Sequence, residues 1–257
     1  MTKLAYQLYS SRNFGPLSDT LTMLAELGYE DVEGYGALMG DAGSVEALTS
    51  GLDATGLSMP TAHIGLDQIE QNPNHIIELA KRFAMRAIIV PYLEPDERPG
   101  DALGWKAFGK RLALAGQPII EAGFEFGWHN HDFEFQPMPS GDYPIDFILG
   151  AGEHVKLEFD LAWAQIAGHN PEAWLDQLGS RVIAAHIKDI APKGEKTDEG
   201  GWADVGTGIM DWPKLYTQLK ALGVPSLVVE HDNPSDDGRF ACASLTALRG
   251  FETTQSL

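Results

Sequence analysis

Short apolar runs and amphipathic segments alternate along the chain from end to end. Apolar runs of about four to eight residues between turn residues are typical of strands, whereas apolar residues spaced three or four apart are typical of helices. The pattern predicts strands at residues 4–9, 31–35, 60–64, 86–91, 124–128, 155–160, 182–188 and 226–230. It predicts helices at residues 17–27, 44–54, 73–83, 102–122, 145–149, 171–178, 212–222 and 236–249.

A strand followed by a helix occurs eight times in this pattern. Parallel strands with helical crossovers close naturally into a (β/α)8 TIM barrel, which is the fold class we expect for this α/β chain. A doubly wound open sheet is the alternative, but it usually begins with a glycine-rich phosphate loop, and no G-x-G-x-x-G follows the first strand. No linker or change in composition divides the chain, so residues 1–257 are expected to form a single domain.

The composition adds a strong negative charge to this picture. The chain has 37 Asp and Glu against 18 Lys and Arg, a formal net charge of −19, and its 44% hydrophobic content allows a sizeable core. Such a field repels nucleic acids and anionic membranes, so neither is expected as a partner. No apolar run reaches the roughly 18 residues that cross a bilayer, and the N-terminus shows no charged and apolar leader. We therefore expect a cytoplasmic protein.

The single cysteine, Cys242, cannot form an internal disulfide. It lies in a segment with a helical pattern, and we expect it to be a small buried residue.

Residues that can bind metals or transfer protons stand where the expected strands end. In a TIM barrel the active site lies at the carboxyl ends of the strands. Carboxylates and imidazoles that converge there can bind divalent cations such as Mn²⁺, Mg²⁺, Co²⁺ or Zn²⁺. Asp160, His186 and Glu230 are the best-placed ligands because each closes an apolar strand. A fourth ligand is expected from His129 or Glu134. The other polar or aromatic residues at strand ends are Gln7, Tyr9, Glu33, His63, Tyr92, His131, Lys188 and His231.

Each candidate also has a structural interpretation. Asp160 could cap a helix that begins at Leu161. His186 could be a core histidine, and Glu134 could be a solvated loop acid. Lys188 could bind an anionic or hydroxyl-rich substrate, or it could lie on the surface. His186 and Lys188 alternate onto one face of a strand, and two such residues facing a packed core are improbable.

Three further features have open roles. His129 and His131 share one face if their strand continues through them, and Asn130 then points away in a structural role. Trp128, Trp163 and Trp202 could form a wall against a sugar ring or belong to the core. The glycine-rich segment 191–208 is long for a connection, and it could cover the pocket or be a surface insertion.

Several segments together resemble the sugar phosphate isomerase/epimerase superfamily, the xylose isomerase-like TIM barrels, over essentially the whole chain. They are residues 7–9, 129–135, 159–163, 186–189, 205–212 and 229–233. The resemblance implies a divalent cation held by an Asp, a His and two Glu, of which Asp160, His186 and Glu230 match three. His129 stands where the first Glu usually lies. Either His129 is the fourth ligand or Glu134 turns in from the loop, and we favour Glu134 because a second carboxylate keeps the charge balanced.

The resemblance also implies a reaction. In this group the metal chelates a substrate carbonyl and a neighbouring hydroxyl, and a base removes the proton between them to give a metal-bound enediolate. Returning the proton elsewhere makes the protein a sugar isomerase or epimerase acting on a keto-sugar or sugar derivative. Expelling a β-substituent makes it a lyase or hydratase acting on a 3-keto-sugar or glycoside. The candidate catalytic residues are Glu134, Glu230, His129 and His131, and the candidate substrate-binding residues are Glu33, His63, Lys188 and Trp163.

Two other functional classes are weighed against an enzyme of this kind. The same barrel hosts a metal-dependent endonuclease for abasic DNA, but that chemistry needs a basic groove, which the net charge of −19 argues against. The letters His-Asn-His also match HNH nucleases, whose motif lies in a small ββα-metal unit and not in a barrel strand. A catalytically silent sugar-binding barrel is the second class, and the ligand candidates at four strand ends argue against it. Barrels of this kind often pair, so a homodimer stays open.

Overall fold

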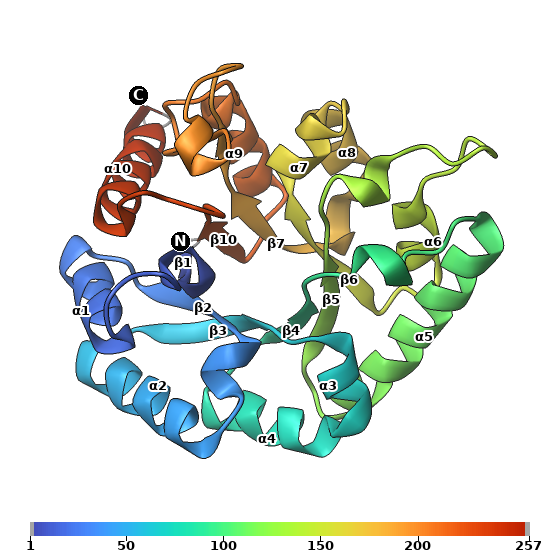
Figure 1. The fold of residues 1–257 in the computed structure, drawn as a ribbon, viewed down its shortest axis with the longest axis horizontal. Helices are drawn as coiled ribbons and strands as arrows, with labels where there is room; N and C mark the ends of the chain where they lie inside the picture. Colours follow the sequence, from blue (N-terminus) through green and yellow to red (C-terminus); the bar gives the residue numbers. More distant parts are fainter. Residues whose placement is uncertain (1–2, 255–257) are drawn as a thin grey trace. The chain divides into compact units, whose positions relative to one another are not determined.

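The computed structural model describes residues 3–254. Eight strands close into a barrel in the order β1-β10-β7-β6-β5-β4-β3-β2, so the predicted (β/α)8 TIM barrel is confirmed (Figure 1). No strand end differs from its predicted position by more than two residues. The barrel strands are β1 (Lys3–Gln7), β2 (Asp31–Tyr35), β3 (Ser58–His63), β4 (Ala87–Val90), β5 (Glu125–His129), β6 (Val155–Asp160), β7 (Val182–Ile187) and β10 (Ser226–Val229).

The helices follow the predicted pattern with two additions. The six-residue helices α3 and α7 were not predicted as helical segments, although a helix starting at Leu161 was weighed. The helices are α1 (Leu17–Leu27), α2 (Ala42–Thr55), α3 (Leu66–Gln71), α4 (Pro73–Arg82), α5 (Ala102–Glu121), α6 (Pro144–Gly150), α7 (Leu161–Ile166), α8 (Pro171–Leu178), α9 (Trp212–Ala221) and α10 (Asp237–Thr254). Short 3-10 helices are η1 (Leu8–Ser11), η2 (Gly36–Met39), η3 (Pro95–Glu97), η4 (Phe133–Phe135), η5 (Gly179–Arg181) and η6 (Thr197–Glu199).

The chain divides into two compact units. The first contains Met1–Met59 with Ala185–Leu257, and the second contains Pro60–Ala184. Both divisions fall inside strands, in β3 and β7, and not in linkers. The single-domain organisation of the chain stays a prediction.

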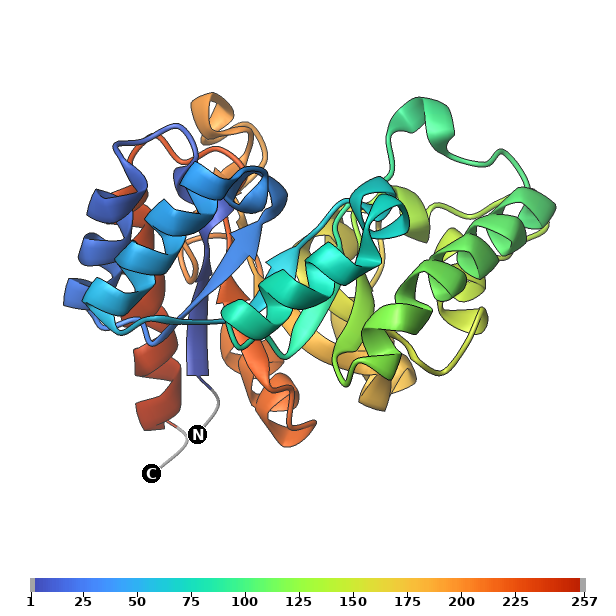
Figure 2. The ribbon, with the colours of Figure 1, turned by 90° about the horizontal axis from the view of Figure 1, so that it is seen from below.

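In the first unit, β1 pairs with β2 and with β10 in parallel. Helices α1 and α2 pack side by side, and α10 lies beside α1 (Figure 2). Tyr6 of β1 is fully buried. The centre of its ring lies 5.5 Å from that of Tyr29, in a T-shaped contact, and 5.8 Å from that of Phe240 in α10. The Tyr29 hydroxyl donates to the Ala241 carbonyl at 2.9 Å. These contacts hold α10 against the sheet and so position the end of β10.

One prediction for α10 is wrong. Cys242 is exposed to solvent and is not a small buried residue of the core. Its neighbour Ala241 is buried, so the buried face of α10 passes next to Cys242 without including it.

In the second unit, β3, β4, β5 and β6 pair in parallel. The longest helix, α5, packs against β5 and α6, with α3 and α4 beside it (Figure 2). At Gly116 a Cβ atom would lie 2.2 Å from the Phe126 ring. A glycine is therefore required for this close approach of α5 to β5.

Segment 191–208 is more ordered than an irregular loop. It contains β9 (Trp202–Ala203), which pairs antiparallel with β8 (Asp189–Ile190). The buried Asp189 carboxylate accepts hydrogen bonds from the backbone N–H groups of Ile190, Gly206, Gly208 and Met210 at 2.9 to 3.1 Å. A Cβ at Gly208 would lie 2.2 Å from the same carboxylate. One buried side chain therefore anchors both ends of the segment.

Among residues 3–254, no helix combines the length and the apolar character needed to cross a bilayer.

Candidate active site

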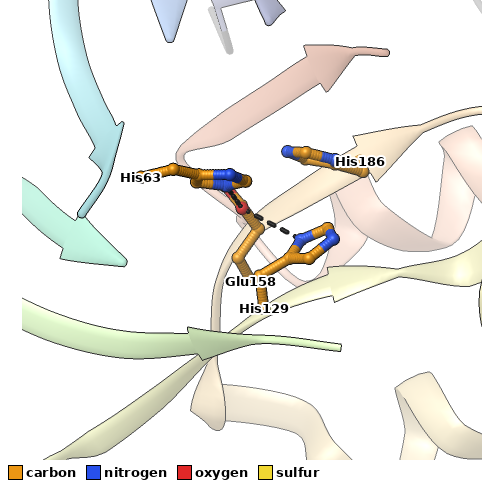
Figure 3. A group of neighbouring side chains, drawn as sticks. All are labelled: His63, His129, Glu158 and His186. Atoms are coloured by element: carbon orange, nitrogen blue, oxygen red, sulfur yellow. Dashed lines mark hydrogen bonds and ion pairs between the residues drawn. The ribbon is translucent and has the colours of Figure 1, made fainter. Parts of the chain in front are cut away.

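A buried carboxylate and two imidazoles meet at the strand ends of the second unit. His63 ends β3, His129 ends β5, and Glu158 lies in β6. Glu158 Oε2 lies 2.5 Å from His63 Nε2 and 3.1 Å from His129 Nδ1 (Figure 3). All three residues are buried, and the two rings are 5.0 Å apart. One carboxylate oxygen therefore orients two imidazoles.

Glu158 was not among the predicted site residues. The sequence did contain a signal for it, since Glu158 and Asp160 alternate onto the same face of β6. Both are fully buried, and an unpaired buried carboxylate is costly, so a charged partner or ligand is expected for each.

Asp160 has the structural role considered above, that of a helix cap. Its Oδ1 accepts a hydrogen bond from Trp163 N at 3.0 Å, which caps α7. Asn130 also has the expected structural role, because its side chain bonds the Asp160 backbone at both N–H (3.0 Å) and carbonyl (3.1 Å). A carboxylate has about four acceptor positions, so capping does not prevent Asp160 from binding a cation.

Glu134 lies in a different environment from the one expected of the fourth ligand. It is fully buried in η4, and its two oxygens accept hydrogen bonds from Trp128 Nε1 at 2.7 Å and His131 N at 2.8 Å. Burial raises the pKa of Glu134 to about 8. Within the described chain it belongs to no group of side chains close enough to share a cation. Trp128 is fully buried, so the interpretation of Trp128 as core is confirmed.

The strand β5 ends at His129, so His131 does not continue its inward face. The centres of the His129 and His131 rings nevertheless lie 5.1 Å apart. The His131 ring also lies 4.9 Å from Tyr92 and 5.3 Å from Trp163. An aromatic layer that includes the predicted substrate-binding Trp163 therefore surrounds His131.

The raised pKa of Glu134 predicts a pH-dependent contribution to stability. A raised pKa in the folded state stabilises the protein below the ordinary glutamate pKa, near 4.3, and this contribution is lost as pH rises through about 8. The free energy of unfolding of the wild type, relative to Glu134→Gln, should fall by up to about 4 kcal/mol between pH ~5 and pH ~8. Urea unfolding of both proteins across this range measures the difference.

The control for this experiment is Glu97→Gln, which changes an exposed glutamate of the same unit. The free energy of unfolding of Glu97→Gln should differ from that of the wild type by the same amount throughout this pH range. A constant difference for Glu134→Gln as well would show that the buried Glu134 stays ionised.

In the first unit, a chain of hydrogen bonds orients His186. Gln7 Nε2 donates to Glu33 Oε1 at 2.7 Å, and the same oxygen lies 2.8 Å from His186 Nε2. An ionised carboxylate only accepts hydrogen bonds, so the imidazole proton resides on Nε2. The other nitrogen, Nδ1, lies 3.6 Å from Glu230 Oε2. A nitrogen lone pair and a carboxylate are thereby presented side by side.

Lys188 is buried next to this pair, so the alternative of a surface lysine is wrong. Its Nζ lies 2.8 Å from Glu230 Oε2, 2.6 Å from Asp232 Oδ2 and 4.1 Å from the centre of the Trp202 ring. Burial opposes ionisation of Glu230, yet the charge of Lys188 holds its pKa well below the usual range. Burial, with the nearby Glu230 charge, raises the pKa of Asp232. The Trp202 ring covers the ammonium group of Lys188, so segment 191–208 contributes directly to the environment of this lysine.

The predicted site residues thus fall into two sets, each described within its own unit. The second unit brings together His63 and His129 through Glu158, and it places Asp160 on the same strand face. The first unit brings together Glu33, His186, Glu230 and Lys188. Mixed carboxylate and imidazole donors of this kind suit Mn²⁺, Co²⁺ and Zn²⁺ better than they suit soft metals.

Comparisons with known proteins identify the family and similar folds. The model of the xylose isomerase-like TIM barrel family matches residues 21–249. No curated protein matches the chain in sequence. A solved structure of a sugar phosphate isomerase/epimerase from Parabacteroides distasonis has a TM-score of 0.79 and 19% identity, with 98% of this chain and 96% of that chain covered.

Two further solved structures have related folds. The 3-keto-D-glucoside 4-epimerase YcjR from E. coli has a TM-score of 0.71 and 20% identity, over 97% of this chain and 100% of that one. The probable 3-DHS dehydratase AsbF from Bacillus anthracis has a TM-score of 0.76 and 14% identity, over 96% and 98%. At such identities these likenesses concern the fold. The family model, however, spans most of the sequence, and the chain therefore belongs to the xylose isomerase-like TIM barrel family.

Proposed function

We propose that this protein is a divalent-metal-dependent sugar isomerase or epimerase that acts on a keto-sugar or sugar derivative through an enediolate of the substrate. The observation that carries the proposal is the orientation of His186. Its Nε2 bonds Glu33 and its Nδ1 faces Glu230. Metal-binding histidines typically donate their second N–H to a carboxylate in this way, which fixes the tautomer and the ring.

The proposed ligands are Asp160, His186 and Glu230, a trio with the composition of a divalent-cation site. Their strands β6, β7 and β10 are consecutive in the barrel order, which supports a shared site at the carboxyl ends. Three protein ligands leave coordination positions for substrate oxygens, as catalytic metal sites do. The cation, when bound, would polarise a sugar carbonyl and acidify the neighbouring C–H. Glu134 is left out of this set, because among the described residues it lies in no group of side chains close enough to share a cation.

The proposed proton-transfer groups are His129 and His63. Glu158 accepts the Nδ1–H of His129, which leaves Nε2 as the basic nitrogen, and Glu158 orients His63 from its Nε2 side. One of the two histidines could act as the base and the other as the acid, since Glu158 orients both. Such a pair suits a reaction that takes a proton from one position of the sugar and returns it at another. Glu158 is then a positioning residue, and Lys188 keeps Glu230 ionised.

The lyase or hydratase alternative shares the first step and differs in the fate of the intermediate. One of the proteins with a similar fold is a probable dehydratase, which supports the lyase or hydratase alternative. We also propose that the protein is cytoplasmic and that its partner is a small sugar. The net charge of −19 argues against a nucleic acid as the partner.

Metal analysis of the purified protein tests the ligand set. We expect near-stoichiometric metal in the wild type after reconstitution with Mn²⁺, loss of metal in Asp160→Ala, and retention in Glu134→Ala and Glu158→Gln. Loss of metal in Glu134→Ala, with an unchanged circular dichroism spectrum, would restore Glu134 as a ligand. Absence of metal in the wild type would overturn the proposed mechanism and favour a sugar-binding barrel.

Solvent exchange tests the reaction without a known product. The Mn²⁺-loaded protein is incubated in D₂O with a panel of ketohexoses and 3-keto-glucosides, and deuterium in the recovered sugar is measured by mass spectrometry. Wild type should incorporate deuterium, whereas Glu158→Gln should retain metal and lose most of the exchange. Elimination products would identify a lyase.

A further inference from the structure

The outer face of α5 carries a regular stripe of exposed residues. Their spacing alternates between four and three, which places side chains along one face of a helix, as in helix pairs. The stripe consists of Leu103, Ala107, Lys110, Leu114, Gln117 and Glu121, all exposed. Leu103 is 77% exposed and Leu114 is 60% exposed. Two large apolar side chains therefore stand in solvent on the same face of the longest helix.

Leu114 separates two hollows of the second unit. One has a volume of about 510 Å³ and lies between α5 and the end of α6, where Lys110, Gln117 and His154 are among its lining residues. The other has a volume of about 390 Å³ and lies between α5 and helices α3 and α4, where Arg111 is part of its wall. A protruding side chain beside hollows of this size is the arrangement that helices use when ridges pack into grooves. The surface thus contains both a knob and the holes that a knob requires.

The charges along the stripe have a direction. Lys110 lies in the first half of α5, and Glu121 ends it. If two such helices pack antiparallel about a point between Leu114 and Gln117, each Lys110 faces Glu121 of the other helix. The pairing occurs twice by symmetry, and antiparallel helix dipoles add to it. Parallel packing would place like charges opposite each other.

We propose that this face of α5 binds a second copy of the chain as a two-fold symmetric, antiparallel helix pair. Leu114 of each copy occupies the hollow beside Gln117 of the other, and Lys110 pairs with Glu121. Such an isologous interface needs only one self-complementary surface, and the stripe with its hollows is one. The proposal does not depend on the proposed enzymatic function.

Sedimentation velocity over about 1 µM to 1 mM tests the proposal, because weak to moderate interfaces dissociate in this range. Wild type should sediment as a dimer at the upper end. Leu114→Glu should raise the dissociation constant by at least about 100-fold, since it places a charge in each of the two buried contacts. The matched control is Leu222→Glu at an exposed leucine of the first unit, and it should leave the dissociation constant unchanged.

A charge exchange tests the orientation. Lys110→Glu should weaken the dimer about 10-fold by placing it opposite Glu121, and combining it with Glu121→Lys should restore most of the affinity. A wild type that stays monomeric throughout overturns the proposal. A dimer that Leu114→Glu does not weaken, or a charge exchange that fails to restore affinity, also overturns it. Thermal unfolding checks that each variant is folded.

Discussion

Replacing Lys188 by methionine is expected to lower the free energy of unfolding by about 3–5 kcal/mol at neutral pH. Lys188 is 1% exposed, and its Nζ contacts both Glu230 and Asp232. Methionine keeps much of the length of the side chain, so the substitution chiefly removes charge. The buried Glu230 and the partly exposed Asp232 then lose their common cation, and Glu230 must take up a proton or remain uncompensated.

The pH dependence identifies the cause. The pKa of Glu230 is depressed in the folded protein, so Glu230 stabilises the fold above its ordinary pKa, and this contribution is lost as pH falls through the folded-state pKa. The difference between wild type and Lys188→Met should therefore be largest at neutral pH and shrink as pH falls toward the depressed pKa of Glu230, where this carboxylate is protonated in both proteins. Urea unfolding in EDTA measures it without metal.

The control is Lys220→Met, which removes a partly exposed lysine paired with Glu252 at 3.6 Å. A pair of this kind contributes at most about 1 kcal/mol. A loss below about 1 kcal/mol for Lys188→Met would show that Glu230 and Asp232 do not need its charge.

Replacing Glu33 by glutamine is expected to weaken Mn²⁺ binding by about 10-fold to 100-fold. The Glu33 carboxylate accepts a hydrogen bond from His186 Nε2, which keeps the proton off Nδ1 and aims the ring. Glutamine has nearly the same shape but no charge, so the ring becomes less basic and less well oriented. His186→Ala should reduce the affinity at least as strongly. Isothermal titration calorimetry of the metal-free protein with Mn²⁺ measures both effects.

Glu26→Gln, at an exposed glutamate of α1 in the same unit, provides the matched control and should bind Mn²⁺ as the wild type does. Wild-type affinity in Glu33→Gln, together with loss in His186→Ala, would show that the ring is held by other contacts. Wild-type affinity in both variants would remove His186 from the ligand set.

The fold could be predicted because its signal is local. Strand β6 and helix α8 were predicted at their observed limits, since the apolar run and the turn residues that bound it lie in the same short stretch. The six-residue helices α3 and α7 were not predicted, because they span fewer than two helical turns, which is too short to show a repeating apolar pattern. Cys242 was misassigned for a related reason. A small residue next to the buried Ala241 leaves the phase of the buried face uncertain by one position.

The candidate site was only partly predictable. Asp160, His186 and Glu230 were singled out because each ends an apolar strand, and the structure buries all three. Glu134 was expected to turn toward a cation, which stays a prediction, and the sequence did not indicate that its oxygens accept hydrogen bonds from the Trp128 indole and the His131 backbone. The contacts that a turn makes depend on its backbone path, which composition does not specify.

The amino-acid sequence alone predicts the alternation of strands and helices, the barrel class, the acidic charge and the residue types at the strand ends. Each depends on neighbours within a few positions or on composition. Which of these residues meet depends on contacts between distant parts of the folded chain. Glu158 and His63 are 95 positions apart, and Glu33 and His186 are 153 apart. Buried charges must find partners wherever folding brings them, because desolvation makes an unpaired one too costly.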